Sequence, residues 1–241
     1  MSPPPTSTTA SIDVAAISAR ETSFFRDIHP FRTLVESVIP EILVARGPAA
    51  GLTIWCGACS SGQEPYSVAI AVTEAFPELV RDGRLRILAT DLSASMVERT
   101  KAGRFTQREV GRGLPVRHLL RQFQQDGTDW VASRQLRQVV DARVLDLTGS
   151  WPIVPKCDVV FLRHVLTSFN PETKRTILER IRSEVLRPAG SLFLGPGESA
   201  ENNQQSARPF PKGHVHDRSA FPQSCRPRSG RRVGDRNDAR W

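Results

Sequence analysis

Short apolar segments alternate with helical segments along most of the chain, and this alternation limits the folds that the chain can form. Four segments have the length and the apolar content of buried strands. They lie at residues 52–55, 84–91, 157–166 and 191–195. The segments beside them carry apolar residues at helical spacing, at residues 29–46, 64–76, 94–102 and 170–187. Because strands that alternate with helices form a mostly parallel sheet with helices on both faces, the sequence predicts a doubly wound α/β fold.

Residues at the ends of these segments support the predicted helices. Asn170 precedes Pro171 and should cap the helix that begins there. Ser93 can cap the helix at residues 94–102 in the same way. Pro40 lies inside a helical segment, so it should kink or restart that helix.

The composition divides the chain into a folded body and two flanking segments. The chain has 241 residues, of which 39% are hydrophobic, enough for one sizeable domain that we expect at residues 21–199. Residues 1–20 are rich in Pro, Ser and Thr, while residues 200–241 contain no Leu or Ile and many Arg, Pro and Gly. Both compositions are typical of disorder. The N-terminus has no signal-peptide pattern and no apolar run approaches about 20 residues, so we expect a cytoplasmic protein without membrane insertion.

The positive charge of the chain is concentrated near its C-terminus. The formal net charge is +8, but residues 206–241 hold nine Lys or Arg against three Asp, which leaves a net charge of +2 for the remainder. The basic character is therefore weak support for nucleic-acid binding by the folded body, and we expect no nucleic-acid partner. Without a secretory signal, the four cysteines are expected to be reduced thiols.

Small and acidic residues follow the first two predicted strands, where a doubly wound sheet binds its ligands. Gly57 and Gly62 bound a loop of small residues that lets a ligand approach the backbone. Glu64 stands where a phosphate-binding loop would have Lys or Ser/Thr, so the ligand should lack phosphates and could carry a positive charge. Asp91 ends the second strand and suits the two hydroxyls of a ribose, although it could instead cap the next helix. A nucleoside cofactor without phosphates fits this set, and S-adenosylmethionine is the obvious candidate.

The same loop contains Cys56 and Cys59 at the spacing of a thioredoxin motif. In a thioredoxin the first cysteine lies at the helix N-terminus, where its thiolate is stabilised. Here "SSGQEP" follows the second cysteine and the helix should begin near Pro65, so both cysteines are expected in the loop as small buried residues. A zinc site is not expected either, because Cys157 and Cys225 provide no second pair at suitable spacing.

From Glu21 to Ser199 the chain resembles the CheR-type chemotaxis methyltransferases. The resemblance rests on six motifs that occur in the order seen in that family: "ETSFFRD", "IWCGACSSGQEPYSVAI", "ATDLSASMVERTKAGRF", "GLP", "DVVFLRHVLTSFN" and "LRPAGSLFLG". It implies a Rossmann-like S-adenosylmethionine methyltransferase fold with a small β-subdomain inserted at about residues 104–143. It also implies methylation of glutamate side chains in the cytoplasmic domains of chemoreceptors, with S-adenosylmethionine as the cofactor.

The resemblance implies a set of cofactor-binding residues. By their positions in the family motifs these are Thr22, Arg26, Glu64, Asp91, Asp146, Leu147, His164 and Val165. Asp91 would hold the ribose hydroxyls, Glu64 would lie in the methionine and ribose region, and Asp146 and Leu147 would flank the adenine. Arg26 is also the expected catalytic residue, because its fork of donors can hold a carboxylate of the cofactor or of the substrate. A glutamate is already ionised at neutral pH, so no general base is required and alignment should dominate catalysis.

The inserted region is basic, with seven arginines between Arg104 and Arg137. By resemblance it would contact receptor tails, and the charge would steer acidic receptor surfaces toward it. The alternative is an ordinary solvated surface.

Four polar positions depart from the family pattern. Arg20, Asp146 and His164 each stand where the family usually has Asn, and Ser168 stands where it usually has Tyr. The N-terminal helical domain of many family members is expected to be largely absent, and residues 200–241 form an atypical C-terminus. The alternative function is therefore a diverged or truncated relative that binds the cofactor or a receptor with little or no activity. A nucleic-acid methyltransferase is disfavoured, because "FLRH" at the end of the strand that begins at Cys157 lacks the Pro-Pro-aromatic motif of amino-directed base methylation.

Overall fold

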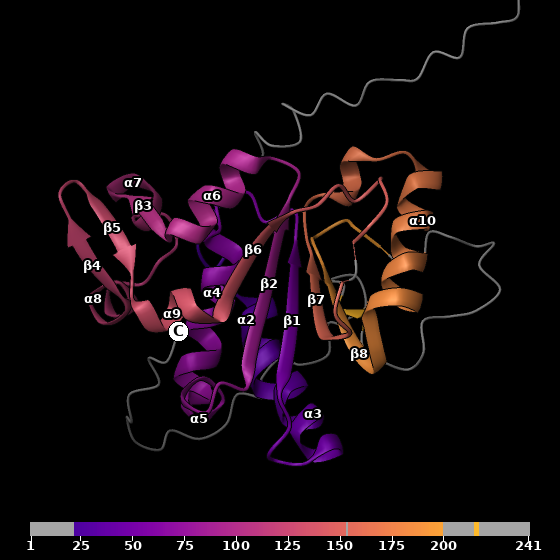
Figure 1. The fold of residues 1–241 in the computed structure, drawn as a ribbon, viewed down its shortest axis with the longest axis horizontal. Coiled ribbons are helices and arrows are strands. Elements are labelled where there is room, and N and C mark those ends of the chain that lie inside the picture. Colours follow the sequence, from indigo (N-terminus) through magenta and orange to yellow (C-terminus); the bar gives the residue numbers. More distant parts are fainter. Residues whose placement is uncertain (1–21, 153, 200–214, 217–241) are drawn as a thin grey trace, which may run out of the picture.

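The computed structural model describes residues 22–152, 154–199 and 215–216 (Figure 1). The predictions for residues 1–20, and for residues 200–241 apart from residues 215–216, lie outside this part. Six strands form one parallel sheet in the order β6-β2-β1-β7-β8-β9. They are β1 (Leu52–Gly57), β2 (Leu85–Asp91), β6 (Val140–Val144), β7 (Cys157–Leu162), β8 (Leu186–Leu194) and β9 (Val215–His216). The predicted mostly parallel α/β fold is confirmed.

Two hydrophobic clusters cover the opposite faces of this sheet. Successive side chains of a strand point to opposite faces, and accordingly Ile54 lies in one cluster while Trp55 lies in the other. Helices α2 (His29–Thr33), α4 (Gln63–Ala75) and α6 (Ala94–Ala102) contribute to the first cluster. The second contains residues of α10 (Pro171–Arg180) and of the π-helix η3 (Ile181–Val185). The sheet is therefore covered by helices on both faces, as a doubly wound fold requires.

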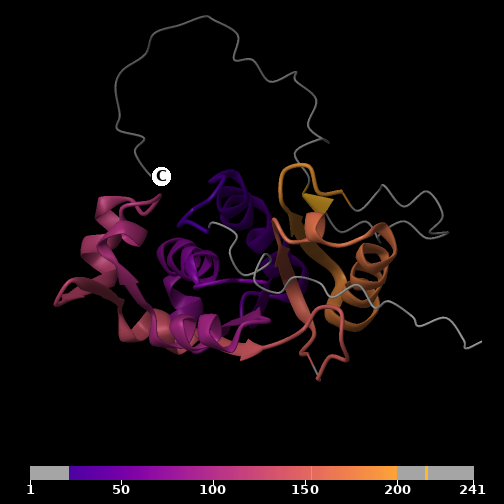
Figure 2. The ribbon, with the colours of Figure 1, turned by 90° about the horizontal axis from the view of Figure 1, so that it is seen from above.

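A small antiparallel sheet is inserted between α6 and β6. Its strands β3 (Arg104–Thr106), β4 (Phe123–Asp126) and β5 (Asp129–Ala132) pair in the order β3-β5-β4. Short helices accompany them: α7 (Gln107–Val110), α8 (Val116–Gln122) and α9 (Arg134–Val139). Figures 1 and 2 place this inserted part at the end of the molecule opposite α10. Residues 140–143, which the sequence analysis grouped with the insertion, lie instead in β6 of the main sheet.

The predicted helix at residues 29–46 consists of three segments. Helix α2 passes into the π-helix η1 (Leu34–Val38), and α3 (Ile39–Arg46) follows. Pro40 lies in the first turn of α3, so the prediction that it restarts the helix is confirmed. The helix predicted at residues 64–76 is α4, and the short α5 (Pro77–Arg81) comes directly after it.

Of the two predicted caps one is confirmed and one is wrong, and the predicted end of the last helix is also wrong. The Oδ1 atom of Asn170 accepts a hydrogen bond of 2.8 Å from the backbone N–H of Thr173, as predicted for the N-cap of α10. The helix ends at residue 185 rather than 187, because Leu186 pairs with Cys157 and begins β8; residues 187–190 form a register irregularity before regular pairing resumes at Ser191. Ser93 occupies the N-cap position of α6, but its side chain accepts no helix N–H.

Strand β7 is shorter than predicted. It ends at Leu162, and residues 163–166, which the sequence analysis assigned to the strand, turn away from the sheet into the 3-10 helix η2 (Leu166–Ser168). His164 has a φ of +61°, a left-handed conformation that no strand accommodates. Arg163 and His164, the two residues after Leu162, therefore lie in the loop at the carboxyl end of β7.

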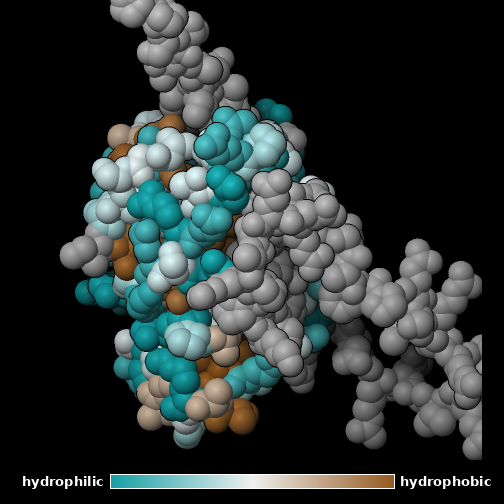
Figure 3. Space-filling view, turned by 90° about the vertical axis from the view of Figure 1, so that its right-hand side faces the viewer, coloured by the Kyte–Doolittle hydropathy of each residue, from teal (hydrophilic) through white to brown (hydrophobic). Residues whose placement is uncertain are grey.

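The surface on the α10 side is mainly hydrophilic, with small separate hydrophobic areas (Figure 3). No helix in the part that the structure describes combines the length and hydropathy of a membrane span.

Candidate functional site

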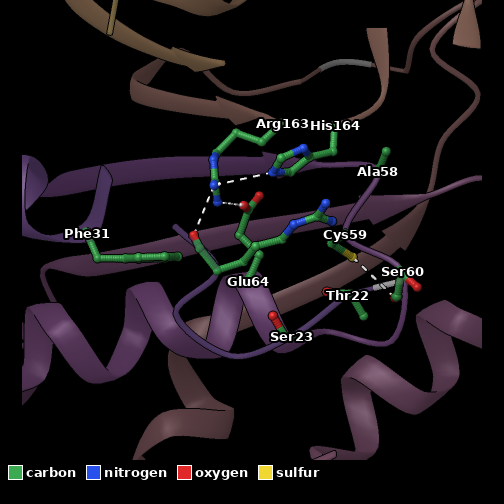
Figure 4. Close-up of a pocket in the computed structure, with 10 residues that line it drawn as sticks. Thr22, Ser23, Phe31, Ala58, Cys59, Ser60, Glu64, Arg163 and His164 are labelled. Atoms are coloured by element: carbon green, nitrogen blue, oxygen red, sulfur yellow. Dashed lines mark hydrogen bonds and ion pairs between the residues drawn. The ribbon is translucent and has the colours of Figure 1, made fainter. Parts of the chain in front are cut away.

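A pocket lies at the carboxyl ends of β1 and β7, where a doubly wound sheet binds its ligands. Its empty space is about 460 Å³ when the open solvent at its mouth is included. Three loops line it, one before α2, one after β1 and one after β7. The lining residues are Thr22, Ser23, Arg26, Phe31, Ala58, Cys59, Ser60, Glu64, Arg163 and His164 (Figure 4).

The loop after β1 is held in an unusual backbone conformation. Ala58 and Ser60 have φ values of +54° and +51°, and Gly62 has +98°. Gly62 is the residue type that this conformation favours, and a Cβ atom there would lie 2.9 Å from the Oγ1 atom of Thr100. Cys59 donates its backbone N–H to the carbonyl of Thr90 at 2.9 Å, which ties the loop to β2. The small residues of this loop thus bring its backbone close to the pocket.

Asp91 is the last residue of β2, and its carboxylate holds the same loop through a hydrogen bond. Its Oδ2 atom accepts the backbone N–H of Ser60 at 2.8 Å, and its Oδ1 atom accepts the N–H of Ser93 at 2.9 Å. The side chain is buried and does not line the pocket itself, although Ser60 does. Each carboxylate oxygen has a second lone pair, so both retain the capacity to accept a ligand hydroxyl.

Arg163 connects the three loops. Its side chain is only 1% exposed. One terminal nitrogen donates to the Oε2 atom of Glu64 at 2.7 Å, and the other donates to the Oδ2 atom of Asp27 at 2.8 Å and to the carbonyl of Arg26 at 3.0 Å. Figure 4 shows Arg163 and Glu64 pointing toward one another, with His164 beside the guanidinium. The sequence analysis did not identify Arg163 as a site residue.

Two titratable groups of the pocket are shifted by burial and by these arginines. The pKa of Glu64 is raised, because burial outweighs Arg163 and the weaker Arg26, which both lower it. Burial lowers the pKa of His164, and the positive charges of Arg26 and Arg163 lower it further. The Nε2 atom of His164 lies 3.1 Å from the carboxylate of Asp27 and 3.5 Å from a terminal nitrogen of Arg163.

Glu198 supports the loop after β7 from the end of β8. It is buried, and its Oε2 atom accepts the backbone N–H groups of His164 at 2.7 Å and of Gly195 at 2.9 Å. Its Oε1 atom accepts the N–H of Thr167 at 3.3 Å. This carboxylate binds the turn that carries Arg163 and His164 to the next strand, and the sequence analysis missed it as well.

The loop before α2 is packed against the inserted part. The Phe24 ring makes edge contacts with Phe105 of β3 and Phe123 of β4, at centroid distances of 4.9 and 5.8 Å. Phe25 stacks on His118 of α8 at 5.4 Å. The backbone N–H of Phe24 also donates to the carbonyl of Arg112 at 3.2 Å. Phe24 and Phe25 of the first motif are thus core residues that join the pocket to the insertion.

The structure brings together half of the site residues expected from the sequence. Thr22, Arg26, Glu64 and His164 line the pocket, and Asp91 lies directly behind it. The other three expected residues do not line it. Asp146 is exposed and accepts hydrogen bonds from Thr148, while Leu147 and Val165 are buried in the second hydrophobic cluster.

The cysteines of the "WCGAC" segment are packing residues. Cys56 lies in β1, which corrects the expectation that it belongs to the loop, and Cys59 lies in the loop as expected. Both are buried, and burial raises the pKa of both thiols. Thiolate formation is therefore opposed at the two positions. Among the described residues, no group of three His, Cys, Asp or Glu side chains is arranged to hold a metal ion.

The chain is similar to one protein family over most of its length. The model of the "CheR methyltransferase, SAM binding domain" family matches residues 20–214. Chemotaxis protein methyltransferase 1 of Pseudomonas aeruginosa is 43% identical over 194 residues, which cover 78% of this chain and 69% of that protein. Chemotaxis protein methyltransferase Cher2 of Pseudomonas putida is 40% identical over 191 residues, which cover 77% of this chain and 68% of that protein.

Solved structures overlap with the chain more loosely. The N-methyltransferase NodS of Bradyrhizobium japonicum, in complex with S-adenosyl-L-homocysteine, covers 74% of this chain and 68% of its own, with 13% identity and a TM-score of 0.39. Likeness at this level says nothing about the substrate.

Proposed function

The chain belongs to the CheR methyltransferase family, and we propose that it transfers a methyl group from S-adenosylmethionine to glutamate side chains in the cytoplasmic domains of chemoreceptors. The proposal also places the enzyme in the cytoplasm, where those domains lie.

One observation carries the proposal: a buried carboxylate and a guanidinium line the same small pocket. Glu64 lies in the first turn of α4 and Arg26 in the loop before α2, far apart in sequence, and both line the pocket beside the small-residue loop after β1. The amino-acid end of S-adenosylmethionine carries a carboxylate and two positive centres, an ammonium and a sulfonium. The two side chains have complementary charges for these groups. The residues present therefore fit the cofactor.

When bound, S-adenosylmethionine supplies an activated methyl group on a positively charged sulfur. We infer that Glu64 attracts a positive centre of this cofactor, because Arg163 and Arg26 favour its ionised form. Asp91 would accept the ribose hydroxyls with the lone pairs that Ser60 and Ser93 leave open. Thr22, His164 and the backbone of the loop after β1 would complete the cradle.

Arg26 is the residue that we propose to act in the transfer itself. A glutamate substrate is ionised at neutral pH and needs no base, so the chain has to hold its carboxylate in line with the methyl group. The guanidinium of Arg26 can hold this carboxylate, or that of the cofactor, through two parallel hydrogen bonds. Asp146, Leu147 and Val165 stay proposed cofactor residues on the family motif alone, because the pocket described above does not reach them.

The basic inserted part is the proposed contact for receptors. Among its arginines, Arg104 is paired with Asp126 and Asp129 of the same small sheet, so its charge is partly balanced locally. The steering charge would have to come from the arginines of α7, α8 and α9.

Replacing Arg26 by Ala tests the proposal. We expect Arg26→Ala to lower methyl incorporation into a receptor cytoplasmic fragment by at least about 100-fold, while circular dichroism and the unfolding midpoint stay close to wild type. Arg32→Ala is the matched control, because Arg32 lies six residues further on and is half exposed, with a salt bridge of 3.9 Å to Glu36. Near-normal turnover of Arg26→Ala would refute the role of Arg26.

One feature favours the alternative, a relative that binds the cofactor without efficient transfer. The hydroxyl of Ser168 is buried and has no hydrogen-bond partner among the described residues, at the position where the family usually has Tyr. Calorimetric binding of S-adenosylmethionine by the wild-type chain, without methyl transfer to any receptor, would support this alternative.

A further inference from the structure

We propose that Arg163 is a positioning residue of the methyl-transfer site, holding Glu64 and the turn at Arg26 and Asp27 in one fixed arrangement. This inference rests on the function proposed above.

The geometry of Arg163 suits this task better than a single ion pair would. The residue directly follows β7, so its backbone is anchored in the middle of the sheet. Its guanidinium donates to Glu64, which follows β1, and to Asp27 and the carbonyl of Arg26, which precede α2. The donor–acceptor distances are between 2.7 and 3.0 Å. The ring of Phe31 lies 5.7 Å from the guanidinium carbon and limits its movement on another side. A planar fork can serve these partners together, whereas a lysine ammonium is a point charge.

The turn that Arg163 holds is strained. Phe25 and Asp27 have φ values of +47° and +60°, and both are non-glycine residues. Such conformations persist only where the surrounding structure fixes them. Arg163 donates to the carbonyl of Arg26 and to the carboxylate of Asp27, so it restrains the backbone directly after the Arg26 side chain. Without these bonds the turn can relax, and Arg26 would then leave its position at the pocket.

The charge of Arg163 also acts on Glu64. Burial raises the pKa of Glu64, and Arg163 is the strongest of the groups that lower it. The other charged groups near Glu64 are Arg26, which lowers its pKa, and Glu198, which raises it. His164 and Cys56 are kept neutral by their own shifted pKa values. Burial is the largest influence on the pKa of Glu64 even in the wild type, so removing Arg163 raises this pKa further and Glu64 ionises only at a higher pH.

One donor of the buried Arg163 side chain is left without a partner in the part of the chain that the structure describes. The Nε atom of Arg163 has no hydrogen-bond partner among the described residues. A buried donor without a partner lowers stability. Such a local cost is expected at a functional site rather than in a purely structural core.

The test compares Arg163→Met and Arg163→Lys with the wild type. Binding of S-adenosylmethionine is measured by calorimetry between about pH 6 and about pH 9, together with kcat and KM for methyl transfer. We expect Arg163→Met to bind at least about 10-fold more weakly at neutral pH and to regain affinity as the pH rises and Glu64 ionises. Arg163→Lys should keep a flat pH profile but lose kcat, because one ammonium cannot hold Glu64 and the turn together. In the double variant Arg163→Met/Glu64→Gln the pH dependence should disappear.

Arg46→Met is the matched control for a loss of stability. Arg46 forms an ion pair with the buried carboxylate of Asp158 at the opposite end of β7, away from the pocket. This variant should unfold more easily while its affinity and pH profile stay those of the wild type.

The outcomes separate the two proposals. If the wild-type chain binds no S-adenosylmethionine, the proposed function fails. If the wild type binds and Arg163→Met binds equally well with a flat pH profile, the role of Arg163 is refuted. If Arg163→Met does not fold, Arg163→Lys decides, since wild-type kcat and KM in that variant would overturn the inference.

Discussion

The inserted part should shape the cofactor pocket, and replacing Gly113 by Ala tests this. Gly113 has a φ of +85°, and a Cβ atom there would lie 2.1 Å from the carbonyl oxygen of Phe24. Real Cβ contacts essentially never fall below 3.0 Å, so one backbone has to move by at least about 0.9 Å, the difference between these distances. Phe24 lies two residues from Arg26, and a misplacement of this size in a positioning element can cost about 100-fold in rate.

Gly127→Ala is the matched control for backbone strain. Gly127 also has a positive φ, +63°, but nothing lies within 4 Å of the Cβ atom that Ala would add. We expect each variant to lose about 1–2 kcal/mol of unfolding free energy through left-handed strain. Gly113→Ala should lose a further 1–3 kcal/mol or so through the clash.

Urea unfolding, calorimetric binding of S-adenosylmethionine and methyl transfer to a receptor fragment measure these effects. Gly127→Ala should bind and turn over as the wild type does, while Gly113→Ala should lose affinity and up to about 100-fold in turnover. If Gly113→Ala is destabilised but keeps wild-type affinity and turnover, the contact between Phe24 and the insertion does not position the pocket.

Three further predictions concern stability and thiol chemistry. Burial lowers the pKa of His118, so the contribution of the neutral imidazole to stability is complete above about pH 6.5 and is lost as the pH falls toward the folded pKa. In urea unfolding, His118→Gln should lose less unfolding free energy between about pH 7 and about pH 5 than the wild type does. An unchanged loss would contradict this. Asn170→Ala should cost about 1 kcal/mol of unfolding free energy without affecting methyl transfer, because it removes the hydrogen bond to the Thr173 N–H at the start of α10. In a Cys225→Ser variant the three remaining cysteines are buried, so the native protein should show no rapid labelling by a disulfide reagent, whereas fast labelling would revive a redox role.

Most of the fold could be predicted because its strands are buried on both faces. The segments of β1, β2 and β7 are nearly continuous apolar runs, which a parallel sheet requires. Strand β6 was not among the four predicted strands, since it is an edge strand and two of its five residues are exposed. The start of β8 was assigned to a helix, because residues 186–190 read as a helix end followed by "PAG". Pairing with β7 across a register irregularity decided its structure, and such pairing leaves no local signal.

The sequence predicted the site residues that stand at recognisable motif positions, and it missed those whose role depends on being buried. Glu64 and Asp91 follow strands and could be found from their positions at the sheet edge. Arg163 was missed because arginine side chains are mostly exposed, so the residue type alone does not lead one to expect a buried site residue. A signal did exist: Arg163 directly follows six buried strand residues, and Glu64 and Asp27 both need a positive partner near that edge. Glu198 gave less warning, since its partners are backbone N–H groups.

The strained residues of the backbone lie mostly in the three loops that line the pocket. Within the part that the structure describes, six non-glycine residues have a positive φ, and five of them are in these loops: Phe25, Asp27, Ala58, Ser60 and His164. Each costs on the order of 1 kcal/mol and needs fixed neighbours to persist. Those neighbours are the insertion for Phe25, Arg163 for Asp27, Asp91 for Ser60 and Glu198 for His164. The three charged residues among them are buried, and each bonds to the backbone of a loop that lines the pocket. Such an arrangement suits a site that works by alignment, since its loops must be held in place before the substrate arrives.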